Sequence, residues 1–518
     1  MGAARPTAVK RGKNSIERKF RRINYRSSTR GGEEWAVGAA GASRISAMAS
    51  FLRRFGSVAD GGLPPGANAA GPSRSWLGEG EASPIDHASS RAADGAWSEQ
   101  AGVGSPRSVT LARPAPAASS ASGASGAIAQ ASAGTSPAPS IAAEIASLEQ
   151  NGSLSYNSVL TILDAAAAGG MTASKFAALN TFASELNAPG GIAVTAYVQQ
   201  IADDVIDGNS ANATWNGGAS TATKLGNLSA SSSQTQADEL IDEWFLGANL
   251  PSLSLAAVGQ SNLHPTYQNS TLPLYGPSGA PTYQDVNQGY LGDCYFLSAL
   301  GETALQDPSA IESMITNNGN GTYGVRFMVN GQPDYVTVNS ALPVMGAGYH
   351  WANGSTLEFA NGNTDDWVAL VEKAYAELNA QTNAPHGMEL NSASDSYEGI
   401  AAGTASALTL LTGQSVTDYA LNPKDSASAL ASIMSSVTSS FSAGEQVLMS
   451  TPASSNGNLV GDHMYMITGV NPANGTVTVQ NPWNSAYSGT LSMTFTESIQ
   501  ELAQDNCSLY AASGRPVA

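Results

Sequence analysis

Helical spacing of apolar residues begins at Ile141 and continues to about residue 252. Large apolar side chains recur there every three or four residues, the repeat of an amphipathic helix, at Phe176, Leu179, Phe182 and Leu186 and again at Leu240, Ile241, Trp244 and Phe245. Glycine pairs separate the helices. The pattern predicts a small all-α domain over residues 141–252. Its residues are of types that pack rather than react, so we interpret it as a packing or prodomain module.

A mixed pattern of helices and strands follows from about residue 263. Helical spacing dominates its first part, and strand alternation with Asn-Gly turns dominates its second part. The expected helices are 294–305, 366–379 and 428–441, and the expected strands are 323–328, 335–338, 446–450, 463–470, 477–480 and 491–495. This order predicts an α+β fold over 263–513 with two lobes, a helical lobe at about 263–405 and an antiparallel β lobe at about 406–513. A cleft is expected between the lobes.

Residues 1–139 lack both patterns and are predicted to be a disordered leader. The Ala/Ser/Pro/Gly tract at 101–140 has too few large apolar side chains to offset the entropy of ordering its backbone. The first 54 residues hold 13 Lys or Arg and 3 Asp or Glu, whereas the rest of the 518-residue chain holds 10 and 38. We interpret the basic head as a tail or an addressing segment rather than as a nucleic-acid or membrane site.

The acidic balance of the remaining chain argues against nucleic acid as the main ligand and suits cationic substrates or a divalent metal. No stretch approaches the ~20 apolar residues of a transmembrane helix, and the N-terminus lacks the apolar core of a secretory signal peptide. These features leave the compartment open, either cytoplasmic or exported without a standard signal. They leave the oligomeric state open.

One of the two cysteines, Cys294, follows a Gly-Asp turn and begins an apolar run. Asp293 suits an N-cap, so Cys294 is expected in the first turn of a buried helix, where unpaired N–H groups and the macrodipole lower a thiol pKa. Gln288 lies six residues upstream, from where its carboxamide could donate to an oxyanion. Cys294 is therefore a candidate nucleophile. A bridge to Cys507 would consume it, and we interpret Cys507 as a buried strand residue.

A nucleophilic thiol needs a base, and the base needs a group that orients it. Among five histidines His463 is the best candidate, because it begins an apolar strand after a polar loop. We interpret His350 as part of an aromatic packing corner and His386 as part of a loop along the cleft. Asn481 lies on the next predicted strand, where its carbonyl could accept a hydrogen bond from the imidazole and fix its tautomer, with Trp483 as a shield.

Four motifs, in order, resemble those of the calpain family of cysteine proteases over about residues 265–512. They are Gln288-Gly-Tyr-Leu-Gly-Asp-Cys294, Trp367-Val-Ala-Leu-Val-Glu372, Gly461-Asp-His463-Met-Tyr465 and Gln480-Asn-Pro-Trp483. The resemblance implies a two-lobed, papain-like fold and endopeptidase activity through a thioacyl intermediate. It implies Cys294 as nucleophile, His463 as general base and acid, Asn481 as the orienting residue, and Gln288 with the Cys294 backbone N–H as the oxyanion hole.

Three positions depart from the family's usual residues. Tyr295, Met464 and Asn484 stand where tryptophan, alanine and glycine are common. None of them removes a catalytic group. The departures therefore bear on substrate preference and loop geometry.

No cofactor is required for this chemistry, but the resemblance also implies calcium as an activator, with Asp285 and Glu372 at matching ligand positions. The ordinary alternatives are that Asp285 caps a turn and that Glu372 pairs with Lys373. No Asp-x-Asp-x-Asp-Gly calcium loop occurs in the sequence. Two separated carboxylates are a weak metal signature.

Our main hypothesis is a calpain-like cysteine endopeptidase that acts on proteins or peptides, responds to calcium and cleaves its own leader between about residues 100 and 140. The alternative is a catalytically degenerate protein that binds peptides on the same fold without cutting them. Acyl transfer to an amine instead of water would use the same residues and would give cross-linked products.

Overall fold

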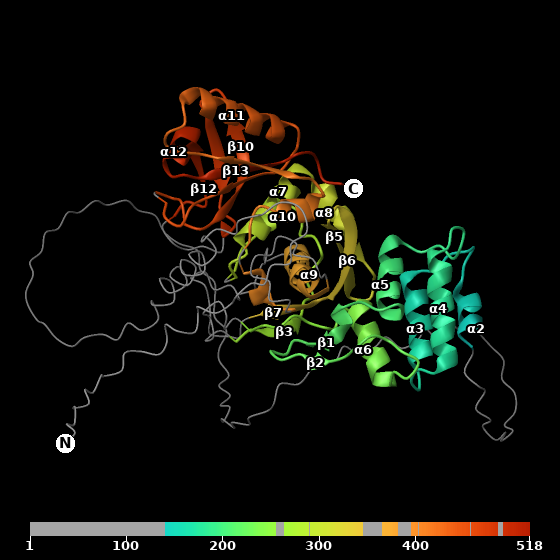
Figure 1. Ribbon diagram of the computed structural model, residues 1–518. Helices are drawn as coiled ribbons and strands as arrows, with labels where there is room; N and C mark the ends of the chain where they lie inside the picture. The colour runs from blue at the N-terminus through green and yellow to red at the C-terminus, as the bar shows by residue number, and fades with distance from the viewer. Residues whose placement is uncertain are drawn as a thin grey trace, which may run out of the picture. The chain divides into compact units, whose positions relative to one another are not determined.

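A computed structural model of the chain describes residues 140–254, 264–289, 291–344, 365–381, 395–401, 403–455, 457–484 and 491–517. All of these residues belong to the compact unit Ser46–Ala518. Figure 1 shows their helices and strands. The predicted leader at 1–139, His350 and His386 lie outside the described residues.

Residues 140–254, called the helical segment below, form five α-helices, a 3₁₀ turn and a short strand pair. They are α2 (Ile141–Leu148), α3 (Tyr156–Ala167), α4 (Ala173–Asn187), α5 (Ala196–Ile206), η2 (Ala211–Ala213), β1 (Thr214–Trp215), β2 (Thr223–Lys224) and α6 (Gln234–Trp244). A serine or threonine hydroxyl before each α-helix accepts a first-turn N–H, which fixes where that helix begins. The apolar stripes close on a core that includes Phe182 and Trp244.

A three-stranded antiparallel sheet follows, in the order β4-β5-β6. It consists of β4 (Ile315–Asn317), β5 (Thr322–Val329) and β6 (Gln332–Asn339), while β3 (Thr266–Asn269) pairs with β7 (Ala341–Val344) elsewhere. Asn330 and Gly331 both have positive φ angles at the β5–β6 turn, the conformation that an Asn-Gly hairpin favours. The two predicted strands of this hairpin are confirmed, and both are longer than expected.

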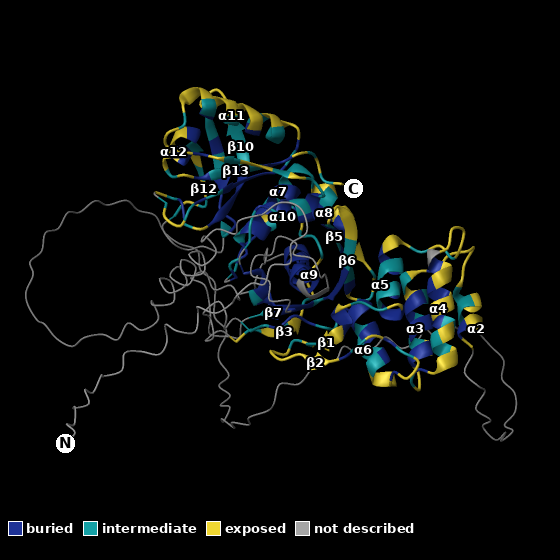
Figure 2. Cartoon of the chain, viewed as in Figure 1, coloured by how far each residue is buried: buried dark blue, intermediate teal, exposed yellow. Residues whose placement is uncertain are grey.

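Helix α7 (Cys294–Gln306) lies at the centre of the core that this sheet helps to build. The same core takes in α8 (Pro308–Met314), α9 (Trp367–Gln381), η4 (Tyr397–Ile400) and α10 (Ala407–Thr412). Every residue from Tyr295 to Ala304 is buried, and Figure 2 shows α7 and α9 as almost wholly buried. A helix without an exposed face is enclosed on all sides, so the position of its first residue is tightly fixed.

A six-stranded antiparallel sheet, in the order β12-β11-β10-β9-β13-β8, forms the second half. Its strands are β8 (Val416–Ala420), β9 (Val447–Ser450), β10 (Met464–Asn471), β11 (Thr476–Gln480), β12 (Thr494–Ser498) and β13 (Ser508–Ala512). Val447 and Met449 pack in the core of α11 (Ala427–Ser442) and α12 (Ile499–Gln504), whereas Leu448 packs in the core of α7. Because neighbouring strand residues point to opposite faces, the sheet lies between α11 and α7.

The expected α+β fold is confirmed in the described residues, with two differences in detail. The strand expected at 491–495 is β12 at 494–498, because its ladder begins where Thr494 pairs with Gln480 at the end of β11. Five strands of this region were not predicted, and each spans five residues or fewer: β3, β4, β7, β8 and β13. Among the described residues, no helix is long and apolar enough to cross a membrane.

Candidate active site

Cys294 is the first residue of α7, and Asp293 occupies the cap position before it. The Asp293 carbonyl accepts the N–H groups of Phe296 and Leu297 at 2.9 and 3.1 Å, which starts the helix. Its side chain makes no capping hydrogen bond, because the buried carboxyl contacts that of Glu372 on α9 instead. The predicted position of the cap is confirmed, but the expected side-chain cap is wrong.

His463 and Asn481 are hydrogen-bonded to each other. They lie just before β10 and just after β11, whose antiparallel pairing places Met466 opposite Gln480. His463 Nε2 lies 3.0 Å from Asn481 Oδ1, and the same oxygen accepts the backbone N–H of Trp483 at 3.0 Å. Since a backbone N–H only donates, the Asn481 atom is an acceptor, so Nε2 is the imidazole donor. In the neutral ring Nδ1 is then left as the basic nitrogen.

The His463 ring is enclosed and held in place. Its backbone N–H donates to Thr451 Oγ1 at 3.1 Å, and the Thr451 N–H donates to the His463 carbonyl at 3.0 Å. The rings of Tyr465 and Trp483 lie with centroids 4.8 and 5.1 Å from the imidazole. Desolvation lowers the His463 pKa to about 4, against the opposing effect of the Asn481 hydrogen bond. Sequence reasoning missed Thr451, whose one signal is its place at the end of a strand.

The Cys294 thiol has a raised pKa, so the prediction of a lowered one is wrong. Desolvation raises the pKa to about 12, and the charges of Asp293 and Asp462 add to the rise, while the backbone N–H groups of Met464 and Tyr295 lower it. The helix N-terminus thus acts in the expected direction, but burial outweighs it. Burial thus favours the neutral thiol and the neutral imidazole.

Gln288 is buried in the turn before α7. Its Nε2 donates to the Leu291 carbonyl at 2.7 Å, and its backbone N–H donates to the Pro482 carbonyl at 2.8 Å. The second bond joins the turn before Cys294 to the segment that carries Asn481. Because a primary amide has two N–H groups, one donor is left for a further acceptor.

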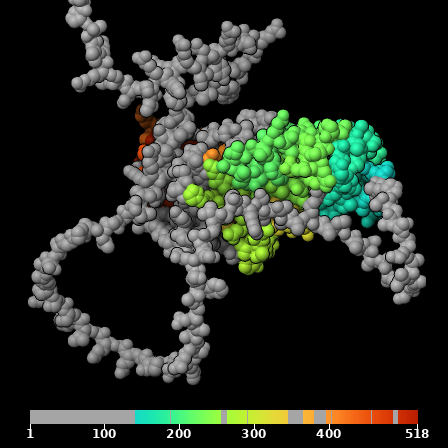
Figure 3. Space-filling model, turned by 90° about the horizontal axis from the view of Figure 1, so that it is seen from below, coloured from blue at the N-terminus to red at the C-terminus, as the bar shows by residue number. Residues whose placement is uncertain are grey.

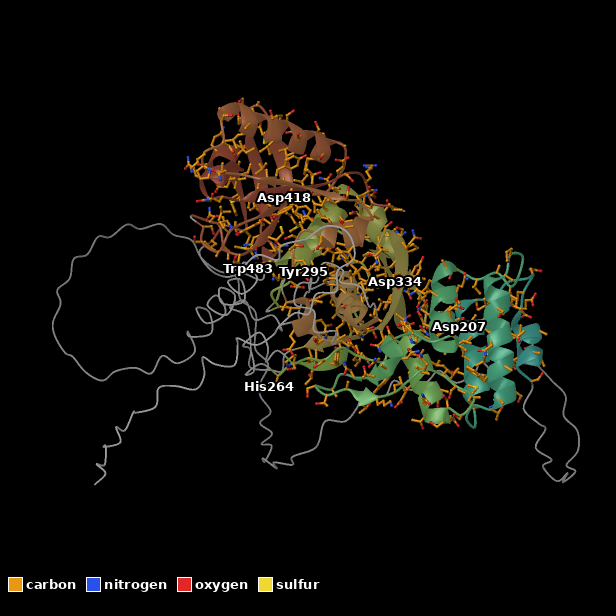
Figure 4. All side chains as sticks on the ribbon, viewed as in Figure 1. Asp207, His264, Tyr295, Asp334, Asp418 and Trp483 are labelled. Atoms are coloured by element: carbon orange, nitrogen blue, oxygen red, sulfur yellow. The ribbon has the colours of Figure 1, made fainter. Side chains whose placement is uncertain are left out.

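Two of the three unusual positions have a structural explanation. Asn484 has a φ angle of 43°, a conformation that glycine adopts easily and asparagine tolerates, and its Nδ2 donates to the carbonyls of Gln284 and Val286 at 2.7 and 3.1 Å. Tyr295, labelled in Figure 4 together with Trp483, is buried and donates to the Ile400 carbonyl at 3.0 Å. Each polar group therefore has a hydrogen-bond partner in the structure.

Asp285 and Glu372, the predicted calcium ligands, are engaged with other groups. The Asp285 carboxylate accepts the Thr282 N–H at 2.7 Å, the Thr282 hydroxyl at 2.9 Å and Trp367 Nε1 at 2.9 Å, while Glu372 contacts Asp293. In the part of the chain that the structure describes, no group of three or more His, Cys, Asp or Glu could hold a metal ion. In this arrangement Asp285 caps a turn and holds the first residue of α9, and the calcium site stays a prediction.

The described residues contain two other cysteine or histidine side chains, Cys507 and His264. Cys507 is a free thiol in the core beside α11, and Cys294 is free as well, so no bridge joins them. His264 is exposed at the start of the range 264–289. Of the five histidines in the sequence, His463 is the one that the described residues place next to a predicted site residue.

Comparison with known proteins gives one consistent result. Residues 271–509 match the family described as calpain family cysteine protease. Calpain-13 of Rattus norvegicus is 28% identical over 247 residues, which cover 45% of this chain and 32% of that protein. The calpain-type cysteine protease DEK1 of Zea mays is 34% identical over 113 residues (21% of this chain, 5% of that protein), and calpain clp-4 of Caenorhabditis elegans is 32% identical over 156 residues (29% and 19%). The chain spans about a third or less of the length of these relatives.

Proposed function

We propose that the chain is a cysteine endopeptidase with the nucleophile Cys294, the base His463 and the orienting residue Asn481. The proposal starts from the match of residues 271–509 to the calpain family of cysteine proteases. The observation that carries the proposal is the hydrogen bond from His463 Nε2 to Asn481 Oδ1 at 3.0 Å. It leaves Nδ1 unprotonated beside strand β10, whose first N–H contacts the Cys294 sulfur. The proposed fold is the two-lobed, papain-like one.

In the proposed reaction the thiol is deprotonated as it attacks. The Cys294 proton passes to His463 Nδ1 while the S–C bond to the substrate carbonyl forms, because both groups are neutral at rest. The imidazolium then protonates the amine as the C–N bond breaks, which leaves a thioester. Water attacks the thioester, giving its proton to His463, and the S–C bond breaks as the thiol regains a proton.

The proposed oxyanion donors are the second N–H of the Gln288 carboxamide and the backbone N–H of Cys294. The Gln288 side chain is held by its bond to Leu291 at 2.7 Å, so its second N–H has a fixed direction. Replacing one such donor costs about 10²- to 10³-fold in turnover in other proteases. We expect Gln288→Ala to lose activity in that range and to keep the thiol modifiable.

Hydrolysis of a fluorogenic casein and labelling with a thiol-directed epoxide test the proposal together. We expect the wild-type chain to hydrolyse casein, Cys294→Ala to lose hydrolysis with its unfolding temperature unchanged, and the epoxide to modify Cys294 in preference to Cys507. Hydrolysis retained by Cys294→Ala would refute the role of the cysteine. Asn481→Ala, which frees the imidazole to take either tautomer, should reduce kcat more than KM.

A second candidate function is peptide binding without cleavage. The observation that favours it is the Cys294 pKa of about 12, which gives almost no thiolate at pH 7. In that case Cys294 and Cys507 are labelled at equally slow rates, and casein is bound but not cut. Cross-linked products with an added amine would instead indicate acyl transfer.

Calcium activation and removal of the leader stay predictions. A calcium ion at Asp285 requires that carboxylate to release Thr282 and Trp367, so calcium should change the fluorescence of Trp367 as well as activity. Activity that is equal in calcium and in chelator would refute the calcium prediction.

Removal of the leader is tested by intact mass, which should show the wild-type chain cut between about residues 100 and 140 and the Cys294→Ala chain uncut. Full-length mass for both proteins would refute it.

A further inference from the structure

One face of α7 is turned toward strand β10 and carries polar residues below the nucleophile. Cys294, Ser298 and Glu302 are spaced by four residues and therefore lie one above another along the helix. Ser298 and Glu302 are both fully buried. Buried polar side chains in a helix interior need partners, and both of these side chains have a partner on a strand outside their own helix.

Ser298 bonds to the strand instead of to its own helix. Its Oγ donates to the Met464 carbonyl of β10 at 3.0 Å. Serine and threonine inside helices commonly donate to the carbonyl four residues earlier, and Thr303 of the same helix does so, with Oγ1 at 2.8 Å from the Ala299 carbonyl. The difference shows that the Ser298 hydroxyl joins two elements that are 166 residues apart in sequence.

Glu302 makes a second junction two turns below Cys294. Its Oε1 accepts the backbone N–H of Val447 on β9 at 3.3 Å and Nε2 of Gln306 at 3.1 Å, and the N–H of Ile467 on β10 also lies close enough to act on its pKa. Between the two junctions Gly301 admits β10 closely. A Cβ atom there would lie 2.4 Å from the sulfur of Met466, so the helix and the strand are in direct contact along this face.

The strand held by these contacts is the one that positions the candidate base. Met464 directly follows His463. Its carbonyl accepts the hydrogen bond from Ser298, and its backbone N–H contacts the Cys294 sulfur. A displacement of α7 along β10 would therefore change the distance from the sulfur to the imidazole. Misplacement by about 1 Å can reduce turnover about 10²-fold.

We propose that Ser298 and Glu302 are positioning residues. They fasten the helix of the nucleophile to β10, which follows the base, and to its neighbour β9, and they thereby set the separation of the Cys294 sulfur and the His463 ring. The proposal rests on the proposed function, because the separation matters only if the pair reacts. Helix α7 would then have two roles. It carries Cys294 as its first residue, and its lower turns fix the position of the helix along β10.

The test compares Ser298→Ala and Glu302→Leu with Glu302→Gln and with the control Thr303→Val. Thr303→Val also removes a buried hydroxyl from α7, but one that bonds only within the helix. We expect Ser298→Ala and Glu302→Leu to lower kcat about 10- to 100-fold with KM nearly unchanged. Glu302→Gln keeps an oxygen that can accept the Val447 N–H and should recover most of the loss. Thr303→Val should change the unfolding temperature without changing kcat.

A second readout separates this proposal from the proposed function. The rate of Cys294 alkylation by iodoacetamide, followed by peptide mass against pH, reports the sulfur and imidazole pair without any proteolysis. In one outcome the alkylation rate of Cys294 in the wild-type chain depends on His463, but the chain cuts no substrate. That outcome would refute the endopeptidase and leave the positioning proposal standing. Ser298→Ala and folded Glu302→Leu with wild-type kcat and wild-type alkylation profiles would overturn the positioning proposal. If Glu302→Leu does not fold, Ser298→Ala against Thr303→Val decides.

Discussion

Glu243 lies buried where the helical segment meets the rest of the described chain, and its protonation should control stability. It is on α6, 4% exposed, and Oε2 has no hydrogen-bond partner. Desolvation raises its pKa to about 8, the charges of Asp395 and Asp204 act in the same direction, and a hydrogen bond from Asn249 opposes them. The folded chain therefore holds this proton at neutral pH, whereas the unfolded chain releases it near the ordinary value of 4.5.

The sign and the size of the effect follow from these two values. The folded state binds more protons between pH 4.5 and pH 8, so stability falls as the pH rises through that window and is greatest below it. At pH 7 the difference spans about 2.5 pH units, which at ~1.36 kcal/mol for each unit is about 3 kcal/mol. Glu243→Gln resembles the protonated side chain and cannot ionise. We expect it to stabilise the chain by about 3 kcal/mol at pH 7 and by less than about 1 kcal/mol at pH 5.

Urea unfolding at pH 5, 6 and 7 measures this effect, with the fluorescence of the adjacent, buried Trp244 as the signal. The background is Cys294→Ala, so that self-cleavage cannot intervene. Glu239→Gln is the control, because Glu239 lies on the same helix but is only partly buried. We expect that control to shift stability by no more than about 0.5 kcal/mol. Equal pH dependence in Glu243→Gln and its parent would refute the reasoning.

Two further predictions concern backbone contact and thiol charge. Gly247→Ala should cost at least about 1 kcal/mol more stability than Gly331→Ala in thermal unfolding. Both glycines have positive φ angles, but a Cβ at Gly247 would lie 2.6 Å from the Val338 backbone, whereas one at Gly331 would meet nothing within 4 Å. Equal losses of stability would contradict this contact. Asp462→Asn should lower the Cys294 pKa, since it removes a negative charge that raises it, and alkylation should reach its half-maximal rate at a lower pH; an unchanged or higher midpoint would contradict it.

The place of Cys294 at a helix start and the pairing of His463 with Asn481 could be predicted, because each depends on a local pattern in the sequence. A Gly-Asp turn precedes the cysteine, and an Asn-Gly hairpin separates the two strands that bring the histidine and the asparagine together. Such signals act over a few residues, so they are readable from one sequence. The hydrogen bond at 3.0 Å then follows from strand pairing.

The thiol pKa could not be predicted in the same way. The helix terminus is a local feature, but the desolvation that outweighs it comes from elements far apart in sequence. Asp293 illustrates the same limit, since its predicted capping role is lost to Glu372, a residue of another helix. Ionisation depends on the complete surroundings of a group, and a single stretch supplies only part of them.

The role of the helical segment follows from strand β6. Val336 and Val338 of this strand pack in the core of α7, so alternation predicts that Thr337 and Asn339 face water. Both are nevertheless buried, because the helical segment covers them. Thr337 donates to the Trp244 carbonyl at 2.6 Å, and Asn339 donates to the Gly247 carbonyl at 2.7 Å. Figure 3 shows the atoms of the helical segment adjoining those of the residues that follow it.

Because the helical segment covers a polar strand face in this way, we expect the fold to need it, which would not hold for a removable prosegment. Asn339 Oδ1 also accepts Lys373 Nζ of α9 at 2.8 Å, so the contact continues to the helix that carries Glu372. A chain that begins at residue 264 would expose Thr337 and Asn339 and should lose both its cooperative unfolding and its Cys294 reactivity, whereas a chain that begins at residue 140 should keep both. A stable, reactive chain from residue 264 would contradict this argument. Self-cleavage is therefore compatible with a folded active site before residue 140 but not within the helical segment.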